Sequence, residues 1–175
     1  RQMCIRDSYV FAGGASDEPG AARSVDFDGT GDYLLTSSSS DFTFGTNDFT
    51  IEHWVKPDSI TSVQQVIDGR MQGNSWSSDW CTYINNDATY RFFVGGDRIQ
   101  STKLVRSAWN HIAVVRSSGI TTLYLNGVKQ GSWSDSTNYT SSQITIGIHG
   151  PDRNSYAFDG KLSNVRVFKG VAVYN

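Results

Sequence analysis

Short apolar runs, separated by turn-forming residues, are the feature that most constrains how this chain can fold. About a dozen recur from Ser24 onward, and none carries the apolar stripe of an amphipathic helix. This pattern is typical of antiparallel strands in a two-sheet sandwich. The strands that it predicts span residues 24–28, 33–37, 49–56, 64–68, 80–85, 90–94, 98–104, 109–116, 121–125, 128–132, 143–148 and 160–168.

The composition also favours an all-β fold. The chain of 175 residues holds 25 Val and Ile residues against 17 Leu, Ala and Glu residues, the reverse of a helix-favouring balance. The sequence also predicts one turn directly. Asn126-Gly127 lies between two apolar runs, and Asn-Gly accepts the positive φ angles of a type I′ hairpin. We therefore predict an all-β sandwich with a two-residue hairpin at this position.

The run 49–56 illustrates how alternation assigns faces. Successive side chains of a strand point to opposite sides, so one set of alternating residues should face the core. That set is Phe49, Ile51, His53 and Val55. His53 would then be a buried polar group whose hydrogen-bond partner the sequence does not reveal. The side chains that we expect to be largely buried are Trp54, Ile51, Val114 and Leu125.

The two ends of the chain differ from its middle. Residues 1–23 include a Gly/Ala/Pro-rich stretch without alternation, so we predict a leader and linker there and one domain over 24–175. The first eight residues are similar to a sequencing-adapter remnant of metagenomic gene models and not to a signal peptide. Residues 171–175 are strand-like to the last position, and we expect the chain to be a fragment of a longer protein.

Charge and hydropathy argue against two classes of partner. The formal net charge is −2 and the Lys and Arg residues form no cluster, so the electrostatic footprint of a nucleic-acid binder is missing. No apolar run approaches the roughly 18 to 20 residues of a membrane helix. We expect neither a nucleic-acid partner nor membrane insertion.

Four segments carry a family resemblance. They are VDFDGTGDYL at 25–34, FTIEHWVKP at 49–57, WNHIAVVR at 109–116 continuing into LYLNG at 123–127, and FDGKLSNVRVFKG at 158–170. Together they resemble the laminin-G-like jelly rolls of the concanavalin A-like lectin and glucanase superfamily. The resemblance implies two stacked antiparallel sheets whose first and last strands are neighbours. It also implies a module that binds glycans or other extracellular ligands, of the kind found in secreted multidomain proteins and phage tails.

Catalytic signatures are absent from the sequence. Retaining glucanases of this superfamily carry two glutamates and an aspartate on one strand, with the reacting carboxyls about 5 to 5.5 Å apart. Glu52 is the sole glutamate of the predicted domain. No nucleophile elbow, zinc-ligand spacing or phosphate-binding loop occurs either. We therefore expect no enzymatic activity, and glycoside hydrolysis is the least favoured function.

Calcium is the cation that the sequence favours, although no cofactor is required. Asp28 and Asp32 flank a Gly-Thr-Gly turn, and the segment 158–160 repeats the Phe-Asp-Gly of 27–29. If the first and last strands are neighbours, Asp28 and Asp159 approach one another, and a cation would relieve their repulsion. The metal hypothesis therefore places Ca²⁺ at Asp28, Asp32 and Asp159. The alternative is ordinary Asp-Gly turn chemistry.

The polar loop 68–80 is the segment that favours glycan binding. Its two tryptophans could stack on sugar C–H surfaces while neighbouring polar groups bind hydroxyls, and a second aromatic pair follows at residues 133 and 139. The alternative for Trp80 and Trp133 is that they cover the ends of the sandwich. The predicted ligand-binding residues are Arg70, Asn74, Trp76, Asp79, Trp80, Trp133 and Tyr139.

Two functional hypotheses follow from these features. The first is a non-catalytic recognition module for cell-surface glycans, extracellular or virion-associated, within a larger secreted or virion protein. The second is a structural module that contacts other subunits of a phage tail or adhesin. A concave pocket beside Trp76 would favour the first, and a flat apolar patch of more than a few hundred Å² would favour the second. We expect Trp76→Ala to weaken binding without unfolding the domain.

Overall fold

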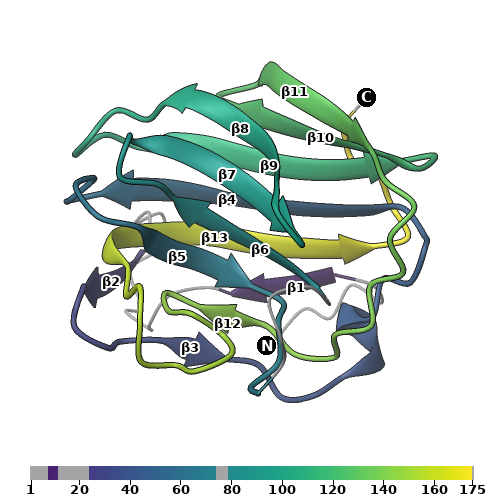
Figure 1. The fold of residues 1–175 in the computed structure, drawn as a ribbon, viewed down its shortest axis with the longest axis horizontal. Coiled ribbons are helices and arrows are strands. Elements are labelled where there is room, and N and C mark those ends of the chain that lie inside the picture. The colour runs from purple at the N-terminus through teal and green to yellow at the C-terminus, as the bar shows by residue number, and fades with distance from the viewer. Residues whose placement is uncertain (1–7, 12–23, 74–78, 175) are drawn as a thin grey trace, which may run out of the picture.

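Two antiparallel sheets stacked face to face make up the fold (Figure 1). The computed structural model describes residues 8–11, 24–73 and 79–174. Sheet A has the order β1-β13-β4-β9-β10-β11, with β2 also paired to β13, and sheet B has the order β3-β12-β5-β6-β7-β8. The strands of sheet A are β1 (Ser8–Phe11), β2 (Val25–Asp28), β4 (Phe49–Pro57), β9 (Asn110–Ser117), β10 (Ile120–Leu125), β11 (Val128–Ser134) and β13 (Asp159–Lys169). The strands of sheet B are β3 (Leu34–Leu35), β5 (Gln64–Asp68), β6 (Trp80–Ile84), β7 (Thr89–Val94), β8 (Asp97–Lys103) and β12 (Thr145–Ile146).

The predicted strand pattern is confirmed. Every predicted strand has a counterpart, and β2 and β13 are neighbours, as the resemblance implied. The one helical element in the described ranges is the 3₁₀ turn Ser40–Phe42, and no helix there is long and apolar enough to cross a membrane. The chain is therefore a two-layer β-sandwich of the jelly-roll type.

The inner faces of the two sheets form one hydrophobic core. The set Phe49, Ile51, His53 and Val55 faces this core, and Val114 and Leu125 are buried as predicted. At one end of the core the rings of Phe44 and Phe49 stack with centroids 4.7 Å apart. The buried imidazole of His53 finds its partner on sheet B, where its Nε2 lies 3.0 Å from the Tyr90 hydroxyl.

The Asn126-Gly127 hairpin is confirmed. Leu125 pairs with Val128 across it, and the two turn residues have φ angles of 51° and 78°. These angles belong to a type I′ turn, whose twist matches that of the flanking strands.

The expected burial of Trp54 is wrong, because 41% of its surface is exposed. Trp54 alternates with His53 and Val55, whose side chains fill the core, so its indole must point to the outer side of β4. Alternation along the strand outweighed the preference of an indole for burial.

A strand also occurs within the predicted leader. β1 pairs with the second half of β13, from Ser8 opposite Phe168 to Phe11 opposite Val165, while β2 pairs with the first half. Four residues are too few for alternation to distinguish a strand from a linker, so no pattern in the sequence predicts β1. A domain that starts at residue 24 does not account for this pairing, and that boundary stays a prediction.

Candidate functional site

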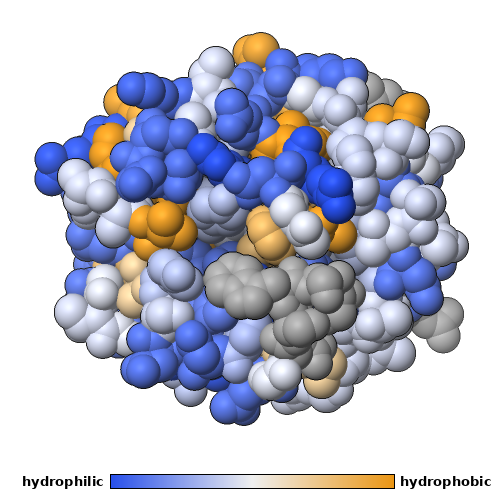
Figure 2. Space-filling model, in the orientation of Figure 1, coloured by the Kyte–Doolittle hydropathy of each residue, from blue (hydrophilic) through white to orange (hydrophobic). Residues whose placement is uncertain are grey.

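A cavity of about 150 Å³ opens on the outer face of sheet B. Strand alternation builds it, because Cys81 and Tyr83 of β6 and Phe93 of β7 point away from the core, with Cys81 and Phe93 opposite one another. The residues that line the cavity are Val63, Gln65, Arg70, Cys81, Tyr83, Asn85, Phe93 and Tyr156. Figure 2 shows this face of the molecule, where small apolar patches lie among hydrophilic side chains. The cavity combines aromatic rings with a few polar groups.

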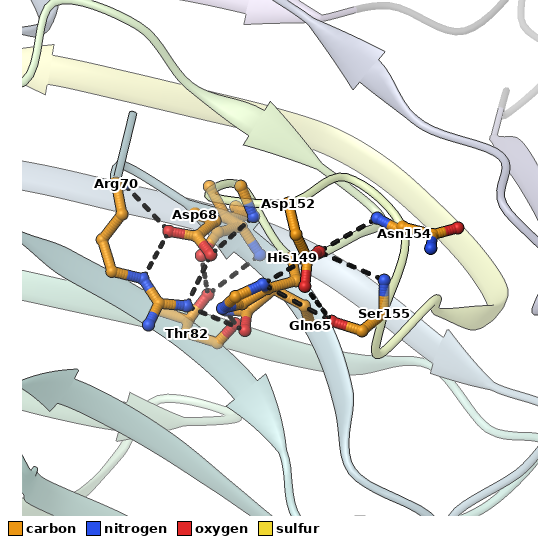
Figure 3. Close-up of polar contacts among 10 residues, drawn as sticks. Gln65, Asp68, Arg70, Thr82, His149, Asp152, Asn154 and Ser155 are labelled. Atoms are coloured by element: carbon orange, nitrogen blue, oxygen red, sulfur yellow. Dashed lines mark hydrogen bonds and ion pairs between the residues drawn. The ribbon is translucent and has the colours of Figure 1, made fainter. Parts of the chain in front are cut away.

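Arg70 contributes a buried guanidinium to the cavity lining. Its Nη2 lies 2.6 Å from Asp68 Oδ2 and its Nε donates to Asp68 Oδ1 at 2.9 Å, a two-pronged pair that Figure 3 shows. Nη2 also donates to the Gln65 side chain at 3.3 Å, and the guanidinium carbon lies 5.7 Å from the ring centre of Phe93. Burial disfavours the charged form, but the hydrogen bond to Asp68, together with the charge interactions with Cys81, Asp68 and Asp152, raises the pKa of Arg70. A permanently charged donor is thus fixed beside an aromatic wall.

A compact turn holds Tyr156 at the cavity. The carboxylate of Asp152 accepts backbone N–H groups of Asn154 and Ser155 at 3.0 and 3.2 Å and the Ser155 hydroxyl at 2.6 Å (Figure 3). His149 Nδ1 lies 3.0 Å from the same carboxylate. Burial alone would raise the pKa of Asp152, but the bonds from Ser155, Asn154 and His149 lower it to about 2. The ionised Asp152 therefore organises the turn, and Tyr156 leaves it with a positive φ of 55° and 43% of its surface exposed.

A charged network holds Tyr83 in the cavity lining. Its hydroxyl donates to Asp97 at 2.6 Å, and Arg91 forms ion pairs with both Asp97 and Asp87. Burial, followed by the contact with Asp97, raises the pKa of Tyr83, so the phenol stays protonated. The backbone of Tyr83 is thus held in β6, and its hydroxyl is held by the charged network.

One of the predicted ligand-binding residues lines the cavity. Three others are buried inside the fold, so the prediction that they contact a ligand is wrong. Trp80 and Tyr139 are fully buried in the core, and their rings have no face left for a ligand. Trp80 occupies an inward position of β6, and the Tyr139 hydroxyl donates to Asp135 at 2.8 Å inside the fold. Asp79 is also fully buried and accepts the backbone N–H of Thr140 at 3.1 Å, and burial raises the pKa of its carboxyl.

The remaining predicted ligand residues lie elsewhere. Arg70 lines the cavity, although its charge is paired with Asp68. Trp133 packs partly against the core, and the Arg98 guanidinium lies over its ring at 4.8 Å. Trp133 does not line the cavity. Asn74 and Trp76 lie outside the described residues.

The predicted calcium ligands are brought together only in part. Asp28 and Asp159 are register partners on β2 and β13, as expected. However, Asp28 Oδ1 accepts the backbone N–H and the hydroxyl of Thr30 at 2.8 and 2.7 Å, and these two bonds lower its pKa. Within the described part of the chain, no group of three or more His, Cys, Asp or Glu residues is arranged to hold a metal. Asp28 and Thr30 thus form an ordinary turn, and the geometry does not support the site with Asp32.

Sequence reasoning missed most of the cavity. Alternation along β6 and β7 could have placed Tyr83 and Phe93 on one outer face, since both strands were predicted correctly. Tyr156 had no comparable signal, because it comes from a loop far along the chain. Gln65 lies next to a register irregularity between β5 and β6, which alternation alone does not predict.

Comparisons with known proteins agree on the fold. The sequence profile of a family described as the concanavalin A-like lectin/glucanases superfamily matches residues 28–172. A search of curated proteins found no match. Among solved structures, a carbohydrate-binding module, CBM40, of the Ruminococcus gnavus IT-sialidase bound to α2,3-sialyllactose is 15% identical, with a TM-score of 0.66 over 86% of this chain and 91% of that one.

Two further structures extend the comparison. A heptameric SAP-like pentraxin from Limulus polyphemus is 16% identical, with a TM-score of 0.64 over 82% of this chain and 74% of that one. Botulinum neurotoxin type C, whose cell entry depends on two ganglioside molecules, is 16% identical, with a TM-score of 0.65 over 94% of this chain and 44% of that one. At these identities the likeness is one of fold.

Proposed function

Because this chain belongs to the concanavalin A-like lectin and glucanase superfamily, we propose that it is a non-catalytic module that binds cell-surface glycans. The observation that carries the proposal is the cavity on sheet B, where Tyr83, Phe93 and Tyr156 supply aromatic surface and Arg70 supplies a fixed donor. Apolar walls with a few orienting polar groups are the usual composition of a small-molecule site. We further propose that the module works in a larger secreted or virion-associated protein.

The size of the cavity limits what it can hold. At about 150 Å³ it is smaller than the pockets of roughly 300 to 1,000 Å³ that bury drug-sized ligands. One sugar residue would therefore enter it while the rest of a glycan lies along the surface. The similar structures support a glycan ligand, since one of them contains sialyllactose and another belongs to a toxin that depends on gangliosides.

The absence of catalysis is part of the proposal. Hydrolysis of a glycosidic bond needs two carboxyl groups that face the substrate. The sheet B cavity has none in its lining, and its Cys81 thiol is buried, which raises its pKa and keeps it protonated. A protonated thiol is a poor nucleophile, so the lining binds a ligand without reacting with it.

A glycan array probed with the complete 175-residue chain tests the proposal. Calorimetry on the best hit should then compare the wild type with Tyr156→Ala and with Tyr33→Ala, because both tyrosines are 43% exposed and only Tyr156 lines the cavity. We expect Tyr156→Ala to weaken binding by about 2 kcal/mol, roughly thirtyfold, and Tyr33→Ala to have no effect. An array without hits, or equal affinities for the two variants, would count against the cavity.

One observation favours the alternative of a subunit-contact module. Tyr33, Leu34 and Leu35 are consecutive and exposed, and β3 is the edge strand of sheet B. Exposed apolar side chains on a strand edge are a common route to association. If light scattering detects dimers that Leu34→Lys abolishes, this edge is a contact surface. A monomer at all concentrations leaves glycan recognition as the proposed role.

A further inference from the structure

The segment after β13 crosses the outer face of sheet A. Figure 1 shows the chain leaving β13 and running across the strands toward β10 and β11. Gly170 N–H donates to the Asp48 carbonyl at 2.7 Å, and the Thr50 hydroxyl donates to the Val171 carbonyl at 2.9 Å while accepting Val173 N–H at 2.9 Å. Thr50 lies on the outward side of β4 and is nevertheless fully buried. The crossing segment therefore covers part of this face.

Beneath this segment lies the carboxylate of Glu52. The Tyr174 hydroxyl donates to its Oε2, and Arg166 Nη1 donates to its Oε1 at 3.2 Å. His111 Nε2 lies 3.6 Å from Oε2. Burial and the bond to Glu52 raise the pKa of Tyr174 to about 12, so the phenol remains a donor at neutral pH. Glu52 is thus buried beneath these groups, with 4% of its surface exposed.

A cleft of about 210 Å³ opens beside this carboxylate. One wall is the indole of Trp54, 41% exposed, with its ring centre 5.1 Å from that of His111. The lining residues are Glu52, Trp54, His111, Asn164, Arg166 and Tyr174. An exposed aromatic platform therefore stands next to one acceptor carboxylate and one guanidinium.

A bulge in β13 shapes the opposite wall. The register with β4 shifts between Ser163, which lies opposite Trp54, and Arg166, which lies opposite Glu52. Asn164 sits in this bulge with a φ of 50° and an exposed side chain. Bulges re-aim side chains, and this one brings Arg166 against Glu52 and leaves the Asn164 amide at the cleft.

We propose that this cleft is a second carbohydrate-binding site, which takes one neutral pyranose ring stacked on Trp54. Glu52 accepts sugar hydroxyls, while Arg166 and Asn164 donate to them. The Tyr174 hydroxyl occupies the place of one sugar hydroxyl on Glu52 until a ligand displaces it. A neutral ring is favoured because Glu52 and Arg166 balance in charge, and a carboxylated sugar would lie against the Glu52 carboxylate. The site is on the opposite sheet from the proposed glycan cavity and does not depend on it.

Calorimetric titration of the complete chain with three neutral probes tests the proposal. The probes are methyl β-galactopyranoside, methyl α-glucopyranoside and methyl α-mannopyranoside. Trp54→Ala has a matched control in Trp109→Ala, because both indoles are 41% exposed and Trp109 is outside the cleft. For the probe that binds, we expect Trp54→Ala to reduce affinity at least tenfold and Trp109→Ala to leave it unchanged.

Two further variants test the polar groups. Asn164→Gly removes the amide but tolerates the positive φ, and we expect it to weaken binding several-fold. Tyr174→Phe frees Glu52 Oε2 and should strengthen binding about fivefold, the effect of one net hydrogen bond. An unchanged affinity in Tyr174→Phe would refute the displaced-hydroxyl role.

The possible outcomes distinguish the second site from the proposed glycan cavity on sheet B. The second site is refuted if none of the three probes binds at millimolar concentration, or if binding survives Trp54→Ala and Asn164→Gly. It is also refuted if Tyr156→Ala, and not Trp54→Ala, abolishes binding of the probe, a result that would support the sheet B cavity. Binding that depends on Trp54 and not on Tyr156 supports the second site even if the cavity takes no glycan.

Discussion

Lowering the pH from 8 to 5 is expected to cost this domain about 2 kcal/mol of unfolding free energy through the single side chain of His53. The imidazole is 1% exposed between the sheets, and its Nδ1 has no hydrogen-bond partner among the described residues. Burial lowers the pKa of His53 to about 3, with a smaller contribution from the charge of His111. The folded domain therefore keeps this histidine neutral at all ordinary pH values.

The sign and size follow from proton linkage. An unfolded histidine has a pKa near 6.5, so below that pH the unfolded chain binds a proton that folded His53 refuses until about pH 3. The contribution of neutral His53 to stability is therefore fully present above pH 6.5 and is lost progressively as the pH drops toward 3. Each pH unit costs about 1.4 kcal/mol, and the one and a half units between pH 6.5 and pH 5 give about 2 kcal/mol.

Urea unfolding at pH 8 and at pH 5 measures this loss, with tryptophan fluorescence as the signal. The control is the double variant His53→Leu/Tyr90→Phe, which removes both partners of the buried hydrogen bond and leaves no polar group without a partner. His111 and His149 remain in both proteins, so the difference between the two pH effects isolates His53. If the double variant loses as much stability as the wild type, or if the wild type is equally stable at both pH values, the reasoning is wrong.

Three further predictions concern the fold. Asp68→Ala leaves the Arg70 guanidinium buried without its carboxylate and should cost about 3 to 5 kcal/mol in urea unfolding, whereas a loss below about 1 kcal/mol would show that the pair is dispensable. Gly127→Ala should cost about 1 kcal/mol of unfolding free energy, because φ is +78° and an added Cβ meets no atom within 4 Å. A much larger loss would show that the positive φ is not the only cause of the destabilisation. Deleting residues 1–20 should lower the melting temperature by no more than a few degrees in calorimetry. A larger drop would show that the pairing of β1 with β13 stabilises the domain.

Much of the sandwich could be predicted because alternation is a local property. The faces of β4 follow from its own residues, and Ile51 is buried as that rule requires. The hairpin at Asn126-Gly127 is likewise local, since the φ angles that Asn-Gly accepts select the turn. Trp54 was mispredicted where hydrophobicity was weighed above alternation, and the structure follows alternation.

The candidate sites could not be predicted in the same way, because each joins segments that are distant in sequence. Trp80 was expected at a ligand surface because a polar loop precedes it, and Tyr139 as part of a second aromatic pair, yet both rings fill the core. Tyr156 reaches the sheet B cavity only through the turn that Asp152 organises. Asn164 depends on a register shift in β13, and neither turn nor shift leaves a periodic signal.

The sheet B cavity and the cleft beside Glu52 are built in the same way. In each, a strand fixes an outward aromatic ring, Tyr83 on β6 or Trp54 on β4, and a segment from later in the chain adds a tyrosine that a carboxylate holds in place. Asp152 folds the turn that ends at Tyr156, and Glu52 binds the Tyr174 hydroxyl directly. Strand positions are tied into the hydrogen-bonded sheet, whereas surface segments open at a lower free-energy cost. At the two proposed sites, ligand specificity would therefore change through the added segments while the β-sandwich stays intact. The two proposed sites would change independently because they lie on opposite sheets.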